Sequence, residues 1–316
     1  MAKGGPGGPG REILVEVVLA REGPSAGRKR VKVNGVPRRA TALSGWSRIV
    51  VFAPEEMLLV VGSPSLRRAA IDQLAADRTP SYGRAMSAYT RALSQRNSLL
   101  KAIREETATR DQLRFWDEAL VESGGEVVAG RLALLDDLAE PLRRAGREIA
   151  PEEGLLGLRY LTNAPVEAGE TPRDALGRRL AATADKEAWQ GTTLVGPHRD
   201  DVAFLLDDRE MAGSASRGQQ RTAILALKLA ELDLITEQDG RPPLLLLDDV
   251  FSELDPARRG HLVRRIAALP QAFVTTTTLA DLDPELRAAG VPWRVDPPDA
   301  ATGTARLVPT ADRDPA

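Results

Sequence analysis

The pattern of hydrophobic and polar positions changes twice along this chain. Near the N-terminus, residues 13–19 and 30–33 are rich in β-branched side chains and predict strands. The Asn34-Gly35 pair that follows is a strong signal for a two-residue hairpin turn, and the apolar run at 47–52 predicts a third strand. This end of the chain is therefore expected to be rich in β-structure.

The middle of the chain follows a helical period. Residues 65–74 predict a helix with Ser65 at its N-cap. Residues 80–186 are expected to be mostly helical and carry two stripes, the first at i, i+4 and i+7 spacing with Leu93, Asn97, Leu100 and Ile103, and the second with Leu132, Leu135, Leu138 and Leu142. Pro141 is expected to bend or end the second of these helices. The heptads are too few for a long coiled coil, so we expect a helical arm whose stripes pack on each other.

The last third alternates between helices and strands. Residues 222–238 and 258–269 predict helices, and residues 244–247 and 273–276 predict strands. The run at 244–247 consists of leucines alone, which is typical of a strand buried on both faces of a parallel sheet. The predicted class is therefore α/β, without internal repeats.

These patterns divide the chain into five parts. We expect a Gly- and Pro-rich flexible leader at 1–10, the N-terminal part of an α/β head at 11–79, and the helical arm at 80–186. The head resumes at 187–296, and 297–316 is expected to be a frayed tail. The arm is thus an insertion into the head.

Composition restricts the possible chemistry. A hydrophobic content of 42% over 316 residues is enough to build the cores of about two domains. The chain has no cysteine and two histidines, so disulfides and thiolate sites are excluded and zinc chemistry is not expected. No apolar run reaches the roughly 20 residues that span a bilayer, and the first residues lack a secretory signal. We therefore expect a cytoplasmic protein without a membrane partner.

Charge is unevenly distributed. The formal net charge is −2, so no bulk positive field marks the whole chain as a nucleic-acid binder. Residues 1–48, however, carry ten Lys or Arg against three Glu, a local net charge of +7. This asymmetry admits a polyanion partner at the N-terminal end, and the alternative is a solvated hairpin.

Two acids follow the leucine run. In open parallel sheets, ligands bind outside the carboxyl ends of the strands, and an acid at that place can hold Mg²⁺ against a polyphosphate. Asp248 fits this role, and Asp249 could orient or deprotonate an attacking water. The alternative is a strand that simply ends in a polar turn.

A small Gly-containing turn precedes the helix predicted at 222–238. Free backbone N–H groups and the positive end of the helix dipole make such a turn a phosphate site, to which Ser216 would add a hydroxyl and Arg217 a charge. Ser216 could equally be an ordinary N-cap. The turn becomes a specific signal for a phosphate site only in combination with the two acids at the end of the leucine strand.

In this order, these segments resemble the C-terminal part of the RecF family of bacterial DNA replication and repair ATPases. The matching segments are 194–201, 216–222, 225–231 and 244–255. Earlier segments agree with the family as well, namely 32–35, 52–56, Arg67-Arg68 with Asp72, and Tyr89 through 95–100. The resemblance extends over about residues 13 to 278.

The resemblance implies an ATPase head of the ABC/SMC type with an inserted, mostly helical arm. In that family, an ATP-bound dimer forms when the signature turn of one subunit closes over the γ-phosphate held by the other. Carried over, Asp248 is the Walker B acid for Mg²⁺, Asp249 the catalytic carboxylate, and Ser252 to Asp255 the D-loop. The residues then expected to bind ATP are Ser216, Arg217, Gly218, Gln219, Gln220 and Asp255.

The sequence departs from the family in three places. Arg217 stands where the family usually has Gln, and Thr276 stands where ABC transporters have the switch histidine. No G-x-x-x-x-G-K-[ST] motif, the phosphate-binding P-loop, occurs in the sequence. We therefore expect the P-loop portion to be absent and the chain not to hydrolyse ATP alone.

Two explanations for the missing P-loop are open. Either the start codon is set too far downstream, or this is a short paralog. We favour the first, because losing the first strands would expose an edge of the central sheet.

By resemblance, the chain is expected to bind single- and double-stranded DNA at gaps and to form an ATP-dependent homodimer. It would help RecO and RecR to load RecA. The candidate phosphate-binding residues are Arg28, Lys29, Arg30, Lys32, Arg38 and Arg39. The alternatives are a nucleotide-independent adaptor that binds DNA or RecR, and another SMC/ABC-type ATPase.

His198 could suggest a nucleophilic triad with Ser214 or Ser216. The sequence has no G-x-S-x-G elbow, which such a nucleophile would need. A turn histidine hydrogen-bonded to a nearby carboxylate is expected instead.

Overall fold

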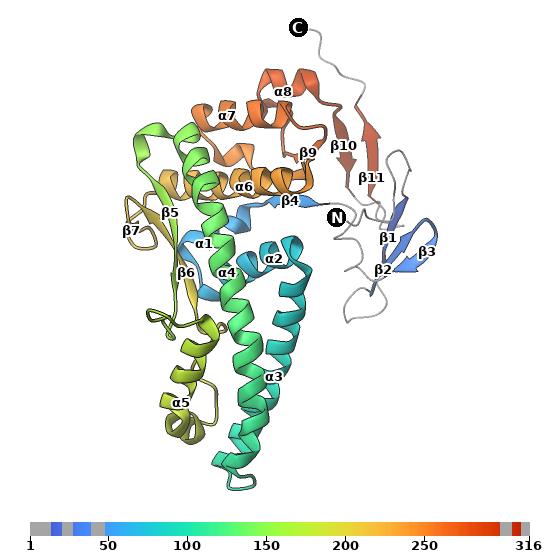
Figure 1. Cartoon of the computed structure of the whole chain (residues 1–316). Helices are drawn as coiled ribbons and strands as arrows, with labels where there is room; N and C mark the ends of the chain where they lie inside the picture. The colour runs from blue at the N-terminus through green and yellow to red at the C-terminus, as the bar shows by residue number, and fades with distance from the viewer. Residues whose placement is uncertain (1–13, 21–27, 39–47, 298–304, 311–316) are drawn as a thin grey trace.

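The computed structural model describes residues 14–20, 28–38, 48–297 and 305–310 (Figure 1). The predicted leader at 1–10 lies outside these ranges. The α-helices are α1 (Leu58–Val61), α2 (Pro64–Arg78), α3 (Pro80–Arg104), α4 (Arg114–Ile149), α5 (Pro172–Gln190), α6 (Arg217–Asp239), α7 (Pro256–Ala267) and α8 (Pro284–Ala289). The strands are β1 (Val15–Ala20), β2 (Arg28–Val33), β3 (Val36–Arg38), β4 (Ile49–Phe52), β5 (Leu156–Leu161), β6 (Asp201–Leu206), β7 (Arg209–Glu210), β8 (Leu244–Asp248), β9 (Ala272–Thr275), β10 (Trp293–Asp296) and β11 (Arg306–Pro309).

A parallel sheet in the order β4-β8-β9 forms the centre of the head. The leucine strand β8 is the middle strand, as its composition predicts. Leu245 and Leu247 are buried, whereas on the other face Leu246 lies in register with Val51 and Phe273, which are 42% and 54% exposed. Helix α6 packs against one face of the described sheet, and the other face is partly exposed. The prediction that both faces are buried is therefore wrong for that second face.

Helix α6 is the core helix of the head. Residues 222–230 are all buried, which is typical of a helix with neighbours on every side. The sheet lies on one side of α6 and helix α4 crosses it on another (Figure 1). The helix ends at Gly240, whose φ of 68° is the left-handed conformation that favours glycine at a helix end.

Three long helices, α3, α4 and α5, form the arm and lie side by side in Figure 1. The predicted leucine stripe is confirmed, since Leu135, Leu138 and Leu142 are buried on α4. Pro141 lies inside this 36-residue helix, so the expectation that it could end the helix is wrong. Packing of Leu138 and Leu142 on either side of the proline stabilises the helix through this point.

Helix α2 begins two residues earlier than its sequence predicts. Its N-cap is Ser63 and not Ser65, because Pro64 occupies the first helical position, where a missing N–H costs nothing. The two serine hydroxyls lie 2.7 Å apart.

The arm and the head share one hydrophobic core. Leu138 of α4 and Leu225 of α6 belong to the same buried cluster. Strand β5, from the predicted arm, pairs antiparallel along its whole length with β6, from the predicted head. The predicted boundary at residue 186 therefore crosses a continuous core and a continuous sheet.

Two further small sheets, β1-β2-β3 and β10-β11, are antiparallel. The turn between β2 and β3 is the predicted one, with φ of 50° at Asn34 and 76° at Gly35. Residues 306–309, expected to be part of a frayed tail, form β11 and pair with β10. None of the helices in the described ranges is both long and apolar enough to cross a membrane.

Candidate functional site

Asp248 lies where the sequence places it, at the carboxyl end of the middle strand of the parallel sheet. Its side chain is exposed, and its Oδ1 accepts a hydrogen bond of 2.5 Å from the hydroxyl of Thr275. Thr275 stands in register with Asp248 on β9. Thr275 could not be predicted as a partner of Asp248, because nothing local in the run at 273–276 shows which strand β9 joins.

Asp249 has a strained backbone and an unsatisfied side chain. Its φ of 49° is unusual for a non-glycine residue, and its N–H donates to the carbonyl of Thr275 over 3.2 Å. Its Oδ1 is buried and has no hydrogen-bond partner among the residues that the structure describes. A buried carboxylate oxygen is costly to leave unpaired, so this atom is suited to a bound cation or water.

The acidic pair fits the coordination habits of Mg²⁺. This ion typically takes one or two protein carboxylates and completes its shell with waters and substrate phosphates. Within the described ranges, no group of three or more His, Cys, Asp or Glu could hold a metal on its own. Asp248 and Asp249 can thus supply part of a Mg²⁺ site that a polyphosphate would complete, and this role remains a prediction.

The turn at Ser216 to Gln219, which the resemblance predicts to be the signature turn, begins α6 with a capping box. Ser216 is the N-cap, and its Oγ accepts from the N–H of Gln219 over 3.2 Å while its own N–H donates to Gln219 Oε1 over 2.9 Å. The ordinary N-cap interpretation of Ser216 is therefore confirmed. Ser216 and Arg217 are exposed, and Gln220 donates to the carbonyl of Ala215.

Gly218 is not required by packing within the chain. A Cβ built on Gly218 would lie 3.6 Å from Arg258 and 3.7 Å from Ser216, which are ordinary contacts. Its φ is not in the left-handed region. If a glycine is needed here, the need comes from something that approaches the turn from outside.

Arg258 joins α6 to Asp255, the last residue of the predicted D-loop. Its Nε donates to the hydroxyl of Thr222 on α6 over 2.9 Å, and its two terminal nitrogens form ion pairs with Asp255 and with Glu153, which follows α4. Asp255 caps α7 by accepting from the N–H groups of Ala257 and Arg258. These backbone bonds, followed by the Arg258 ion pair, lower the pKa of Asp255.

The predicted DNA-binding residues of the hairpin do not share one face. Arg30 and Lys32 alternate with buried Val31 and Val33, whereas Arg38 is in register with Val31 and so lies on their side of the sheet. Lys32 also stands opposite Glu16. Arg28 and Lys29 are on β2, and Arg39 lies outside the described residues.

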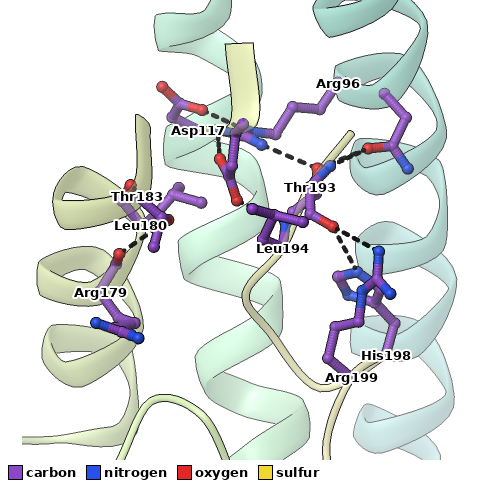
Figure 2. A network of polar contacts seen from close by, with 11 residues as sticks. Arg96, Asp117, Arg179, Leu180, Thr183, Thr193, Leu194, His198 and Arg199 are labelled. Atoms are coloured by element: carbon purple, nitrogen blue, oxygen red, sulfur yellow. Dashed lines mark hydrogen bonds and ion pairs between the residues drawn. The ribbon is translucent and has the colours of Figure 1, made fainter. Parts of the chain in front are cut away.

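The turn around His198 connects the arm to the head (Figure 2). Thr193 accepts from Arg96 over 2.9 Å, and Arg96 is itself buried in ion pairs with Asp117 and Glu187. His198 lies 2.5 Å from the hydroxyl of Tyr89 and 3.4 Å from the Thr193 carbonyl. Its partners are thus a tyrosine and a backbone carbonyl, so the expected carboxylate partner is wrong.

Taken together, a parallel sheet with acids at the carboxyl end of its middle strand, and a capped helix N-terminus on α6, are typical of an α/β nucleotide-binding head, here with a helical arm. No family model matches the chain. Comparison with curated proteins gives the "DNA replication and repair protein RecF" of Symbiobacterium thermophilum, 41% identical over 81% of this chain and 68% of the relative. The RecF of Clavibacter sepedonicus is 37% identical over 96% of this chain and 80% of the relative.

Solved structures agree. Two structures of the recombination mediator protein RecF of the RecFOR pathway, RecF-ATP and RecF-ATPrS, superpose with a TM-score of 0.73 at 34% identity. Each covers 81% of this chain, and this chain covers 69% and 70% of theirs, respectively. The chain belongs to the RecF family of DNA replication and repair proteins, and its fold is the α/β RecF head with an inserted helical arm.

Proposed function

We propose that this chain acts in recombinational DNA repair by binding DNA at gaps between single- and double-stranded segments. An ATP-dependent dimer would clamp the DNA and, together with RecO and RecR, would help to load RecA. The observation that carries the proposal is Asp248 at the carboxyl end of β8 in a chain 41% identical to a RecF protein. The ATP-bound RecF relative supports the choice of nucleotide.

The described residues suggest a division of labour around the nucleotide. Asp248 and Asp249 would hold Mg²⁺, which would neutralise charge on the β- and γ-phosphates. The free oxygen of Asp249 and the hydroxyl of Thr275 bonded to Asp248 favour this assignment. On the opposite subunit, the exposed turn at Ser216 and Gly218 would meet the γ-phosphate through backbone N–H groups.

The test is nucleotide-dependent association. We expect this chain, mixed with a RecF protein that carries a P-loop, to sediment as a complex in Mg·ATP and as separate proteins without nucleotide. Ser216→Asp should abolish the complex, because aspartate caps a helix as well as serine does but places a negative charge where the γ-phosphate would lie. Thermal unfolding should be unchanged, which separates this effect from loss of the cap.

Ser214→Asp provides the matched control. Ser214 is also exposed, lies two residues before the cap, and donates its hydroxyl to the carbonyl of Glu210. This variant should associate like the wild type. If the wild-type mixture sedimented in the same way with and without Mg·ATP, this would contradict the proposal and favour a nucleotide-independent adaptor.

A further inference from the structure

Helix α3 has an unusual charge pattern. Residues 78–104, which contain all of α3, include six Lys or Arg and no Asp or Glu. The other long helices α2, α4, α5 and α6 all contain acids, and α7, which also lacks them, uses Arg258 and Arg265 in ion pairs. The positive charge of α3 therefore calls for a separate explanation.

The exposed side of α3 is a straight polar stripe. Its residues recur at i, i+3 and i+7 and are all exposed: Arg84, Ser87, Arg91, Ser94, Ser98 and Lys101. The opposite side is buried against the arm through Tyr82, Tyr89 and Arg96, among others. At 1.5 Å per residue, the stripe is about 25 Å long.

The three cations of this stripe have no partner within the described part of the chain. The side chains of Arg84, Arg91 and Lys101 form neither an ion pair nor a hydrogen bond there. Arg78, in contrast, pairs with Asp137, and Arg96 is buried in its ion pairs. An unpaired surface cation stays fully available for an external anion.

We propose that the α3 stripe binds the sugar-phosphate backbone of double-stranded DNA. The inference rests on the proposed function and adds the surface that would carry it. Cations spaced along a rod and free of acids complement a line of phosphates, and the short serines between them allow close approach and can donate hydrogen bonds. The length of about 25 Å corresponds to roughly seven base pairs at 3.4 Å each.

Duplex rather than single-stranded DNA is favoured by the position of the aromatic residues. Proteins that bind single strands stack bases on exposed aromatic side chains. On α3, Tyr82 and Tyr89 are 4% and 2% exposed, and they face the arm interior. The stripe therefore offers charge and hydroxyl groups without a stacking platform.

The triple variant Arg84→Gln, Arg91→Gln and Lys101→Gln tests the proposal. We expect its affinity for a gapped duplex, measured by fluorescence anisotropy on the full chain, to fall at least about ten-fold near 0.1 M salt. The slope of log K against log salt should become shallower by about 3, since each phosphate contact contributes about 0.9. Thermal unfolding should stay unchanged, because all three side chains are exposed.

A second triple variant controls for net charge. Arg143, Arg147 and Lys186 are also exposed, on α4 and α5, although Arg143 pairs with Glu140, and their replacement by Gln should change affinity less than about two-fold. If the wild type binds no DNA, the proposed function fails. If the wild type binds DNA and the α3 variant binds it with the same affinity and the same salt slope, the inference is overturned while the proposed function stands. The same holds if the α3 variant loses only the binding of single-stranded DNA.

Discussion

At the scale of single residues, the two neighbouring acids of the site differ in what surrounds them. Asp248 is exposed and bonded to Thr275, whereas Asp249 takes a left-handed φ and keeps one buried oxygen without a partner. Backbone strain and an unpaired buried acceptor at adjacent positions are both costly and are typical of functional sites. This combination supports the assignment of the pair more strongly than either feature alone.

His198 gives a prediction about pH. Burial, followed by the nearby Arg199 guanidinium, lowers the pKa of His198 to about 4. In the unfolded chain its pKa is about 6.5, so between pH 6.5 and about 4 the unfolded state binds more protons than the folded state. The stability that the neutral imidazole contributes is therefore complete above pH 6.5 and is lost as the pH falls toward 4.

We expect His198→Gln to reduce the loss of unfolding free energy between pH 7 and pH 5 by roughly 1 kcal/mol, allowing for partial solvent exposure. Urea unfolding of both proteins at the two pH values measures this difference. Equal losses in wild type and variant would show that the environment of His198 does not set the acid sensitivity.

Residue-level prediction from sequence succeeded where the signal was local. Asp248 and Asp249 follow an apolar run, and Ser216 stands three residues before Gln219, so their positions could be predicted. Thr275 and Arg258 could not be, because their partners depend on which strands pair and on how α7 packs against α6.

At the scale of elements, glycines decide how closely the arm helices approach. A Cβ on Gly125 of α4 would lie 2.8 Å from the Cα of Arg173, at the start of α5. On Gly83 of α3 the nearest atom would be 3.8 Å away. Both glycines are inside helices, so alanine brings the same gain in helix propensity at each site.

We therefore expect opposite effects from the two alanine substitutions. Gly125→Ala should lower the free energy of unfolding by about 1 to 3 kcal/mol, because the backbone of α5 must shift. Gly83→Ala should raise it by about 0.5 to 1 kcal/mol. Chemical denaturation measures both, and a stabilised Gly125→Ala would contradict the close contact between α4 and α5.

Elements were predicted well where the period was long and poorly at their ends. The stripe of α4 and the leucines of β8 follow their sequence patterns. Of the stripe predicted on α3, only Leu100 is buried. The path of α4 through Pro141 and the start of α2 at Ser63 depend on tertiary packing and on Pro64, which outweigh the local signals used.

At the scale of the whole molecule, arm and head were expected to be separate parts, but their interiors are joined. Leu138 of α4 lies in the large cluster that includes Leu225 of α6, while Leu176 of α5 belongs to a smaller cluster with Val195. Sequence could not predict this, since a leucine stripe does not specify its partner. We expect the residues of one cluster to lose their protection against unfolding together.

Two matched substitutions test this coupling. Leu138 and Leu176 are 0% and 1% exposed, so Leu→Ala at either should cost about 2 to 5 kcal/mol locally. By hydrogen exchange with mass spectrometry, we expect Leu138→Ala to lower the protection of the α4 and α6 amides by the same factor. Leu176→Ala should act on α4 and α5 and leave α6 protected. If Leu138→Ala left the protection of the α6 amides unchanged, the arm would be an energetically independent unit. Motion of the arm on DNA could then not be transmitted through the core to the signature turn.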